Sequence, residues 1–296
     1  MRLTPQTQKS VKIDSIRYYH MTSQDPPIFI TFGNRKGGVG KTTSVINLAS
    51  YLANLEKKVL IIDTDPQSNC SSTLLENFDD RNKYSLIDAL EAPKGKTLLS
   101  KFACKTYHPR LKIIPNTTQC MLWERKNAKH SDAVLGIRRL VNQDPKLNEY
   151  DFVFFDTPPN LGVMMNNALM ASDYVIIPIP PSDQFALDGL AAYLELIGGI
   201  RKHNNRLKLL AVLITKYDPD WGNSAYNLNQ IIKYFTQKGI SIFHTHIHNS
   251  PEIDMAHVER KPVIESAPDS NGAKEYSALG RELLEIFNVI YRKRSI

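Results

Sequence analysis

The stretch GNRKGGVGKTT, residues 33–43, decides the fold, because it places four glycines and two lysines between a predicted strand and a predicted helix. The apolar run IFITF ends just before it, and a helical pattern begins at Lys41. Glycines at such a junction let backbone N–H groups approach phosphate oxygens, and the start of the helix adds its positive end. The stretch therefore predicts a phosphate-binding loop.

The side chains of this loop have expected roles. Lys41 would reach the β- and γ-phosphates, the Thr42 hydroxyl would ligate Mg²⁺, and Thr43 can contact the α-phosphate. The loop holds a second lysine, Lys36, which one nucleotide in one subunit does not require. We expect the nucleotide to be held by residues 36–43, namely Lys36, Gly37, Gly38, Val39, Gly40, Lys41, Thr42 and Thr43.

Short apolar runs alternate with helical patterns along the rest of the chain. The runs cover residues 28–32, 59–63, 111–115, 151–156, 174–179, 209–215 and 240–247. The helical patterns cover residues 41–55, 161–171, 183–200, 224–238 and 271–291. This alternation predicts an α/β fold with a doubly wound, mostly parallel sheet flanked by helices. We expect residues 1–27 to be a polar extension and residues 28–296 to form one domain.

Carboxylates stand at the ends of two of the apolar runs. Asp63 and Asp65 close VLIIDTD, and Asp156 closes DFVFFD. Ligands of open α/β sheets bind at the carboxyl ends of the strands. Asp63 and Asp65 face the same way on a strand, so one could support Mg²⁺ and the other could orient an attacking water. Asp156 would hold a water on Mg²⁺.

The loop does not meet the consensus G-x-x-x-x-G-K-[ST], because Arg35 stands where the first glycine belongs. The form that fits, K-G-G-x-G-K-[ST] over residues 36–42, resembles the deviant Walker A motif of the ParA/MinD family of P-loop ATPases. In that family the early lysine, here Lys36, crosses a dimer interface to the neighbour's phosphates. The resemblance thus implies that Lys41 serves its own nucleotide and Lys36 that of a second copy.

Two more motifs carry the resemblance, which runs from about Ile28 to about Ile286. The run DTDPQ, residues 63–67, is similar to the family's D-x-D-P-Q, which implies that Asp65 positions the water and Asp63 belongs to the metal shell. The run DTPP, residues 156–159, matches the family's D-x-P-P turn. The resemblance implies ATP and Mg²⁺ as cofactors and Lys36, Lys41 and Asp65 as the catalytic residues.

The function implied by the resemblance is an ATP-dependent dimerising switch with slow, partner-stimulated hydrolysis. We expect a homodimer with ATP that positions or segregates plasmid or chromosomal DNA through a ParB-like partner, in the cytoplasm and at the nucleoid. The alternatives are a MinD-like regulator bound to a membrane and the positioning of a cargo other than DNA. Two further alternatives are an iron–sulfur or reductase component and a biosynthetic enzyme that phosphorylates or ligates a small molecule.

One segment departs from the family pattern. IHNSPEIDMAHVERKPV, residues 247–263, aligns with a block that usually begins I-P-R-N-x-R. His248 and Ser250 replace the proline and asparagine that usually approach the adenine, while Asp220 and Glu252 fall where chromosome-partitioning relatives carry DNA-binding arginines. The remaining candidates for phosphate contacts with DNA are Lys233, Lys238, Arg260, Lys261, Arg292, Lys293 and Arg294.

Composition narrows these alternatives. The formal net charge of +7 favours acidic partners without deciding among them. Cys70, Cys104 and Cys120 are widely spaced, which argues against a disulfide framework and against an iron–sulfur cluster. No apolar run approaches the roughly 18 residues of a membrane-spanning helix, so we expect a soluble intracellular protein. The pattern over residues 271–291 favours a helix packed on the core over a membrane-surface helix.

Overall fold

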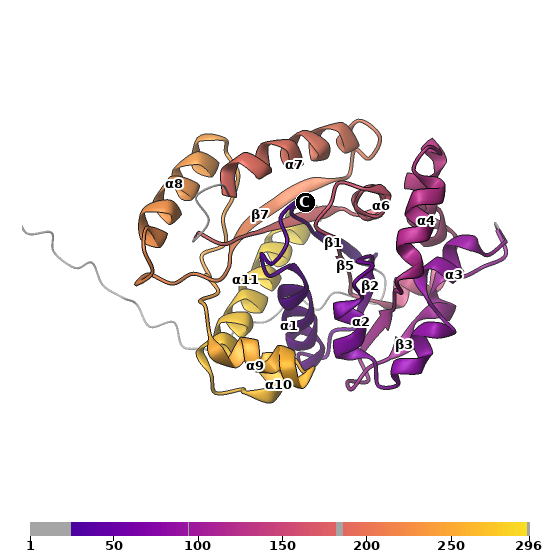
Figure 1. Cartoon of the computed structure of the whole chain (residues 1–296), viewed down its shortest axis with the longest axis horizontal. Helices are drawn as coiled ribbons and strands as arrows, with labels where there is room; N and C mark the ends of the chain where they lie inside the picture. The colour runs from indigo at the N-terminus through magenta and orange to yellow at the C-terminus, as the bar shows by residue number, and fades with distance from the viewer. Residues whose placement is uncertain (1–24, 94, 182–185, 295–296) are drawn as a thin grey trace, which may run out of the picture.

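The computed structural model describes residues 25–93, 95–181 and 186–294. Residues 1–24 of the predicted extension and residues 183–185 of the predicted helix 183–200 lie outside this description. Within the described residues, seven strands form one sheet in the order β3-β4-β2-β5-β1-β6-β7 (Figure 1). All neighbouring strands are parallel except β3, which pairs antiparallel with β4. The sheet confirms the predicted doubly wound α/β fold.

The described elements follow the predicted alternation. The strands are β1 (Ile28–Phe32), β2 (Val59–Asp63), β3 (Cys104–Lys105), β4 (Leu111–Ile114), β5 (Phe152–Asp156), β6 (Tyr174–Ile179) and β7 (Lys208–Ile214). The α-helices are α1 (Lys41–Asn54), α2 (Asn69–Leu74), α3 (Leu86–Glu91), α4 (Gln119–Asn127), α5 (Gly136–Gln143), α6 (Val163–Ala171), α7 (Ala186–Arg201), α8 (Ser224–Gln237), α9 (Pro251–Glu259), α10 (Val263–Ser266) and α11 (Asn271–Arg294). Short 3₁₀ turns cover Phe78–Asn82, Leu99–Phe102, Ser131–Leu135 and Pro145–Glu149.

Helices cover both faces of the sheet. On one face, Ile28, Ile30 and Phe32 of β1 join a core cluster with apolar residues of α1, α2, α9, α10 and α11. On the other face, residues of β2, β5 and β6 pack on α3 to α6 and on α6 to α8 in two further clusters. Because the central strands are buried on both sides, their sequences are apolar throughout, as the runs predicted.

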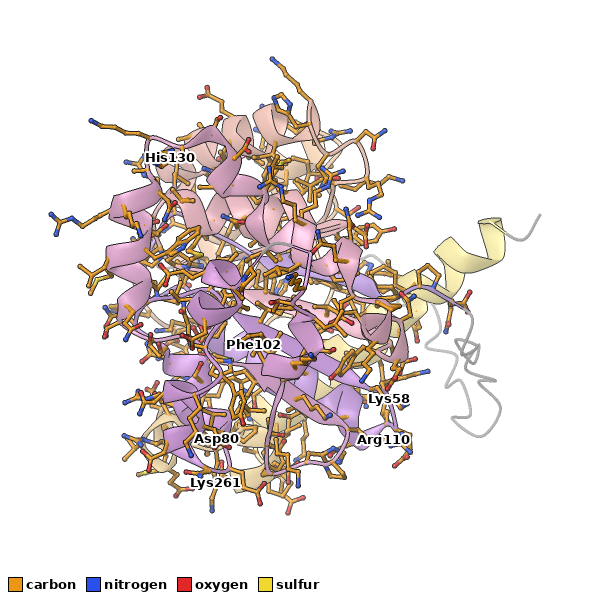
Figure 2. The ribbon with its side chains drawn as sticks, turned by 90° about the vertical axis from the view of Figure 1, so that its right-hand side faces the viewer. Lys58, Asp80, Phe102, Arg110, His130 and Lys261 are labelled. Carbon is orange, nitrogen blue, oxygen red and sulfur yellow. The ribbon has the colours of Figure 1, made fainter. Side chains whose placement is uncertain are left out.

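The strand register brings the carboxyl ends of β1, β2 and β5 to one level. Asp156 is paired in register with Phe32 on one side and with Asp63 on the other. At the opposite edge, Lys58 and Arg110 precede β2 and β4 and lie side by side (Figure 2), where the Val59 N–H donates to the Arg110 carbonyl at 2.9 Å. Because the carboxyl ends of β1, β2 and β5 are at one level, the loops that follow these strands converge on one site.

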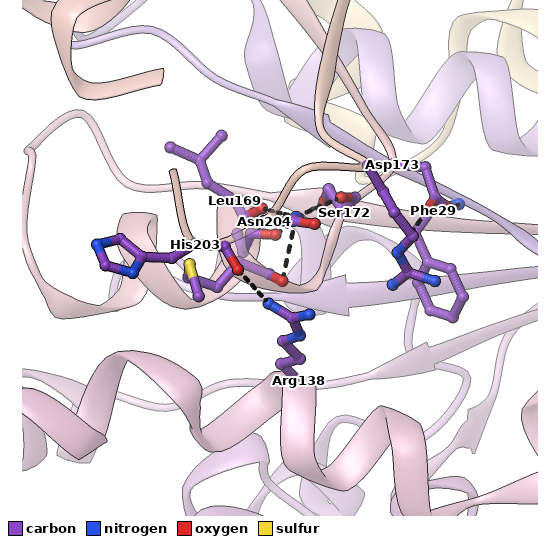
Figure 3. Close-up of polar contacts among 10 residues, drawn as sticks. Phe29, Arg138, Leu169, Ser172, Asp173, His203 and Asn204 are labelled. Atoms are coloured by element: carbon purple, nitrogen blue, oxygen red, sulfur yellow. Dashed lines mark hydrogen bonds and ion pairs between the residues drawn. The ribbon is translucent and has the colours of Figure 1, made fainter. Parts of the chain in front are cut away.

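A buried asparagine, Asn204, fixes the connection between the end of α6 and the start of β6. Asn204 Nδ2 donates to the carbonyls of Leu169 at 3.0 Å, Met170 at 3.2 Å and Ser172 at 2.8 Å (Figure 3). Arg138 Nη1 donates to the carbonyl of His203 at 2.9 Å, which ties α5 to the same turn. These bonds satisfy carbonyls that the end of α6 leaves without helical partners.

The predicted strand at residues 240–247 is wrong. This segment runs beside β7 and exchanges hydrogen bonds with it at Val212 and Ile214, yet it makes one isolated bridge, at Ile242, and no continuous strand. The side chain of Glu282 on α11 accepts the N–H groups of His244 at 2.7 Å and Thr245 at 3.0 Å. The Glu282 carboxylate thus accepts N–H groups that a ladder with β7 would use, and this competition prevents continuous strand pairing.

Candidate nucleotide-binding site

The loop between β1 and α1 is held in shape by contacts with neighbouring strands. Gly38 and Gly40 have φ values of 71° and 83°, a left-handed conformation that favours glycine. Thr215, just after β7, donates its hydroxyl to the Val39 carbonyl at 2.9 Å. Asn34 Nδ2 donates to the Pro178 carbonyl at 2.8 Å. The loop is therefore shaped by three strands before any ligand binds.

Lys41 lies at the start of α1 and is 6% exposed. Its Nζ donates to the carbonyl of Lys36 at 3.0 Å, across the mouth of the loop. Burial lowers the pKa of Lys41, whereas the charges of Asp156 and Asp65 oppose this shift. A buried ammonium held at the glycine loop suits a triphosphate, which would supply the counter-charge.

Thr42 and Asp156 form the pair expected of a metal site. The Thr42 hydroxyl donates to Asp156 Oδ2 at 2.8 Å. Asp156 is fully buried, and its Oδ1 has no hydrogen-bond partner among the described residues. Burial raises the pKa of Asp156 well above its usual range, and the neighbouring Asp63 raises it further. A hydroxyl beside a carboxylate with an unused oxygen fits Mg²⁺, which takes oxygen ligands and bound waters.

Asp63 and Asp65 have different surroundings, although both close the same strand. Asp63 Oδ2 accepts the N–H of Ser71 at 2.9 Å and its hydroxyl at 2.5 Å, and Asp63 Oδ1 accepts the Asp65 N–H at 3.0 Å. Burial raises the pKa of Asp63 to about 7. Asp65 is 8% exposed and accepts one bond through Oδ1, from Gln67 N–H at 2.9 Å. Asp63 fixes the turn, and Asp65 is buried beside it.

The two lysines of the loop are placed differently. Lys36 is exposed, as are Arg35, Gly37 and Gly38, whereas Lys41 is buried. The backbone N–H of Lys36 donates to Asn34 Oδ1 at 3.0 Å, and its carbonyl accepts Lys41. The backbone of Lys36 thus belongs to the loop, while its side chain stands on the outer surface of the site.

A histidine that the sequence did not assign to the site contacts the loop helix. His257 Nε2 of α9 lies 2.9 Å from the Thr43 hydroxyl, 214 residues away in the chain. One turn further along α1, Asn47 Oδ1 accepts the Val263 N–H of α10 at 2.7 Å. No local pattern marks His257, because only the packing of α9 on α1 brings it to the loop.

The comparisons with known proteins agree with this geometry. A family model described as an AAA domain matches residues 28–209. The sporulation initiation inhibitor protein Soj of Bacillus subtilis is 32% identical over 261 residues, which cover 86% of this chain and 97% of Soj. The chain belongs to the ParA/MinD family of P-loop ATPases. The chromosome partitioning protein ParA of Myxococcus xanthus is 31% identical and is covered over 87% of its length, against 86% of this chain.

A solved structure of this family has the same architecture. The putative plasmid partition protein of Borrelia burgdorferi bound to AMPPNP superposes with a TM-score of 0.69 at 25% identity, over 88% of this chain and 98% of that one. The predicted family is therefore confirmed, and the chain is a ParA-like ATPase.

Two residues at the start of the segment that departs from the ParA/MinD pattern make contacts within the protein. His248 pairs with Glu275 on α11, at 2.7 Å between Nδ1 and Oε1, and its ring lies 5.1 Å from that of Tyr217. Ser250 is buried and donates to Glu252 Oε2 at 2.5 Å. The side chains at the two adenine-approaching positions are thus engaged in contacts within the protein.

The predicted DNA contacts do not gather on one patch. Lys233 and Lys238 lie on α8, whereas Arg260 and Lys261 lie between α9 and α10, away from α8 in Figure 1. The four side chains are exposed, as are Asp220 and Glu252. Lys261 is at the opposite end of the molecule from His130 in Figure 2. The side chains of Arg292, Lys293 and Arg294 fall outside the described part of the chain.

The cysteines and the apolar face of α11 are buried in the described part of the chain. Cys70, Cys104 and Cys120 are free and buried. Within residues 25–93, 95–181 and 186–294, no group of three histidine, cysteine or acidic side chains is placed to hold a metal ion. Leu279, Leu283 and Phe287 of α11 are buried in the core. No helix in the described part of the chain has the length and apolar character needed to cross a membrane.

Proposed function

We propose that the chain is an ATP-dependent dimerising switch that segregates or positions DNA. The observation that carries this proposal is the separation of the two loop lysines, with Lys41 buried in the loop and Lys36 on its exposed rim. A lysine on the rim can reach phosphates bound in a second copy that faces the site. Such a cation would add charge neutralisation to the γ-phosphate only when two copies meet.

Within one subunit, each of the site residues would have its own role. The loop N–H groups of Gly37 to Thr43 would cradle the phosphates, with Lys41 on the β- and γ-phosphates. Thr42 and Asp156 would hold Mg²⁺, which neutralises charge on the phosphate oxygens when it is bound. Asp65 is the group we assign to orient the attacking water, since its carboxylate is close enough to Lys41 to raise the pKa of that lysine.

Asp63 is assigned to the metal site in an outer position. Both of its oxygens accept hydrogen bonds from Ser71 and Asp65, and its Cα is paired in register with that of Asp156. We expect Asp63 to fix the turn that carries Asp65 and to act on the ion through bound water. Its replacement would therefore disturb the geometry of Asp65 as well as metal affinity.

The cargo is proposed from the relatives, which are named for chromosome and plasmid partition. We propose a ParB-like partner that stimulates slow hydrolysis by the dimer, in the cytoplasm and on the nucleoid. Lys233, Lys238, Arg260 and Lys261, which are exposed, are the described candidates for contacts with DNA phosphates. Arg292, Lys293 and Arg294 remain candidates from the sequence alone.

A cargo other than DNA is the second candidate function. It is favoured by two exposed carboxylates, Asp220 and Glu252, at positions where chromosome-partitioning relatives carry arginines. Acidic side chains there would repel DNA phosphates. A membrane-bound switch is less favoured, because Leu279, Leu283 and Phe287 of the helix that would lie on the lipid are packed in the core.

The test is co-sedimentation of an Asp65→Ala variant with non-specific DNA, in ATP or ADP, across a salt series. We expect this variant to hydrolyse ATP poorly, and to pellet with DNA in ATP and not in ADP, with binding that falls steeply as salt rises. Lys41→Ala is the matched control, because it should not bind ATP. If an ATP-loaded dimer forms but does not pellet with DNA at low salt, the cargo is not DNA.

A further inference from the structure

The contact between His257 and Thr43 joins α9 to the first turn of the loop helix. Thr43 is 8% exposed, and its hydroxyl lies 2.9 Å from His257 Nε2. Asn47 holds the same side of α1, since its Nδ2 donates to the Thr43 carbonyl at 2.9 Å and its Oδ1 accepts from Val263 at 2.7 Å. The bond from Val263 thus attaches α10 to α1 one turn beyond the contact between His257 and Thr43.

The hydrogen-bonding capacity of the two groups limits how they can pair. A threonine hydroxyl has one proton to donate and two lone pairs to accept with, and a neutral imidazole nitrogen either donates or accepts. Phosphate oxygens at neutral pH only accept. If Thr43 gives its proton to His257, none remains for a phosphate. If His257 donates instead, the Thr43 proton is free to point at the ligand.

Charged groups of both signs lie near His257. Burial lowers the pKa of His257, Asp254 opposes that shift, and Lys216 lowers the pKa further. Lys216 directly follows Thr215, whose hydroxyl donates to the loop carbonyl of Val39, and it has a φ of 49°, a left-handed conformation uncommon for lysine.

We propose that His257 is a positioning residue for the nucleotide, in which its Nε2–H donates to Thr43 Oγ1 and directs the Thr43 hydroxyl proton to the α-phosphate. This inference rests on the proposed nucleotide site. His257 acts through Thr43 and does not itself touch the transferred phosphoryl group. Because ADP and ATP share the α-phosphate, His257 supports the binding of both nucleotides equally, unlike a residue that contacts the γ-phosphate.

The experiment measures the Kd of Mg²⁺·ADP and Mg²⁺·ATP for full-length variants by calorimetry. We expect His257→Ala to weaken both nucleotides by about fivefold, the effect of one lost hydrogen bond. His257→Gln should bind within about twofold of the unmodified chain, because the glutamine Nε2–H can donate to the same hydroxyl. Thr43→Ala with His257→Ala should bind no more weakly than Thr43→Ala alone. A merely structural histidine would show neither the glutamine rescue nor this non-additivity.

The controls separate this inference from the proposed nucleotide site. His130→Ala, at an exposed histidine between α4 and the 3₁₀ turn Ser131–Leu135, should leave both Kd values unchanged. Lys41→Ala should abolish binding, and nucleotide binding that survives it would overturn the proposed site. Unchanged binding in His257→Ala, a loss confined to ATP, or losses that add in the double variant would overturn the role of His257 alone.

Discussion

Thr42 and Asp156, which lie 114 residues apart in the chain, join the phosphate loop to the end of β5 through one hydrogen bond of 2.8 Å. The register that pairs Asp156 with Phe32 of β1 and Asp63 of β2 brings these two residues together. The sheet thus places a hydroxyl and a buried carboxyl group side by side at the mouth of the loop, where a charge on Asp156 would need compensation.

Asp156→Asn is expected to change how stability depends on pH. Burial raises the pKa of Asp156, so the folded chain holds a proton there that the unfolded chain releases. The free energy of unfolding should therefore fall as pH rises from about 4 through neutrality. Since asparagine does not titrate, in buffer without Mg²⁺ the variant should gain stability relative to the unmodified chain between pH 5.5 and pH 8.

Urea unfolding at both pH values, with and without Mg²⁺·ADP, checks this prediction. At one hundred times its Kd, Mg²⁺·ADP should stabilise the unmodified chain by about 2.7 kcal/mol. The Asp156→Asn variant should gain much less, because it lacks the metal-binding carboxylate. Parallel pH curves for the two proteins, or equal stabilisation by Mg²⁺·ADP, would contradict the assignment of Asp156.

Gly33 and Tyr193 are expected to be coupled in stability. A Cβ at Gly33 would lie 1.8 Å from the Tyr193 hydroxyl oxygen and 2.7 Å from Cζ, and Tyr193 is fully buried. Gly33→Ala should therefore cost about 3 kcal/mol of unfolding free energy. The Tyr193 hydroxyl has no hydrogen-bond partner in the described part of the chain, so Tyr193→Phe should change stability by less than about 1 kcal/mol.

A double-mutant cycle measures this coupling by denaturant unfolding. Removing the hydroxyl takes away the closest clash, so Gly33→Ala with Tyr193→Phe should be more stable than the sum of the single changes implies. Additive losses would show that the start of the loop and α7 are not in contact in solution.

The two lysines should differ in their effect on nucleotide affinity. Lys41→Ala should lose nucleotide binding by more than about tenfold, because its buried ammonium stands inside the loop. Lys36→Ala should keep the affinity of one subunit within about threefold and lose ATP turnover. Fluorescent ATP titration and a phosphate-release assay compare the two variants. Equal loss of affinity in both would contradict the division of roles.

The sequence predicted what is local in the fold. The loop glycines, Lys41 and the carboxylates at the ends of β2 and β5 are each set by a short pattern beside an apolar run, and the parallel register then brings them together. The predicted strand at residues 240–247 was wrong, because its apolar pattern does not reveal that Glu282 of α11 accepts its N–H groups. The strand β3, Cys104–Lys105, is too short to leave a pattern.

Contacts that no local pattern marks account for what the sequence missed in the site. His257 of α9 contacts Thr43 of α1 across 214 residues of the chain. The N–H and hydroxyl of Ser71, in α2, both donate to Asp63 Oδ2. Neither contact has a periodicity or a motif in the chain. The sequence therefore placed Asp63 with the metal without showing that its oxygens accept bonds from Ser71 and Asp65.

Sedimentation velocity of Asp65→Ala in ATP, beside Asp65→Ala with Lys36→Ala, measures most directly whether Lys36 of one copy completes the nucleotide site of another. The Asp65→Ala chain should sediment as a dimer in ATP and as a monomer in ADP, and the double variant should stay monomeric in both nucleotides. An ATP-loaded Asp65→Ala chain that stays monomeric, or a double variant that dimerises equally well, would contradict the switch.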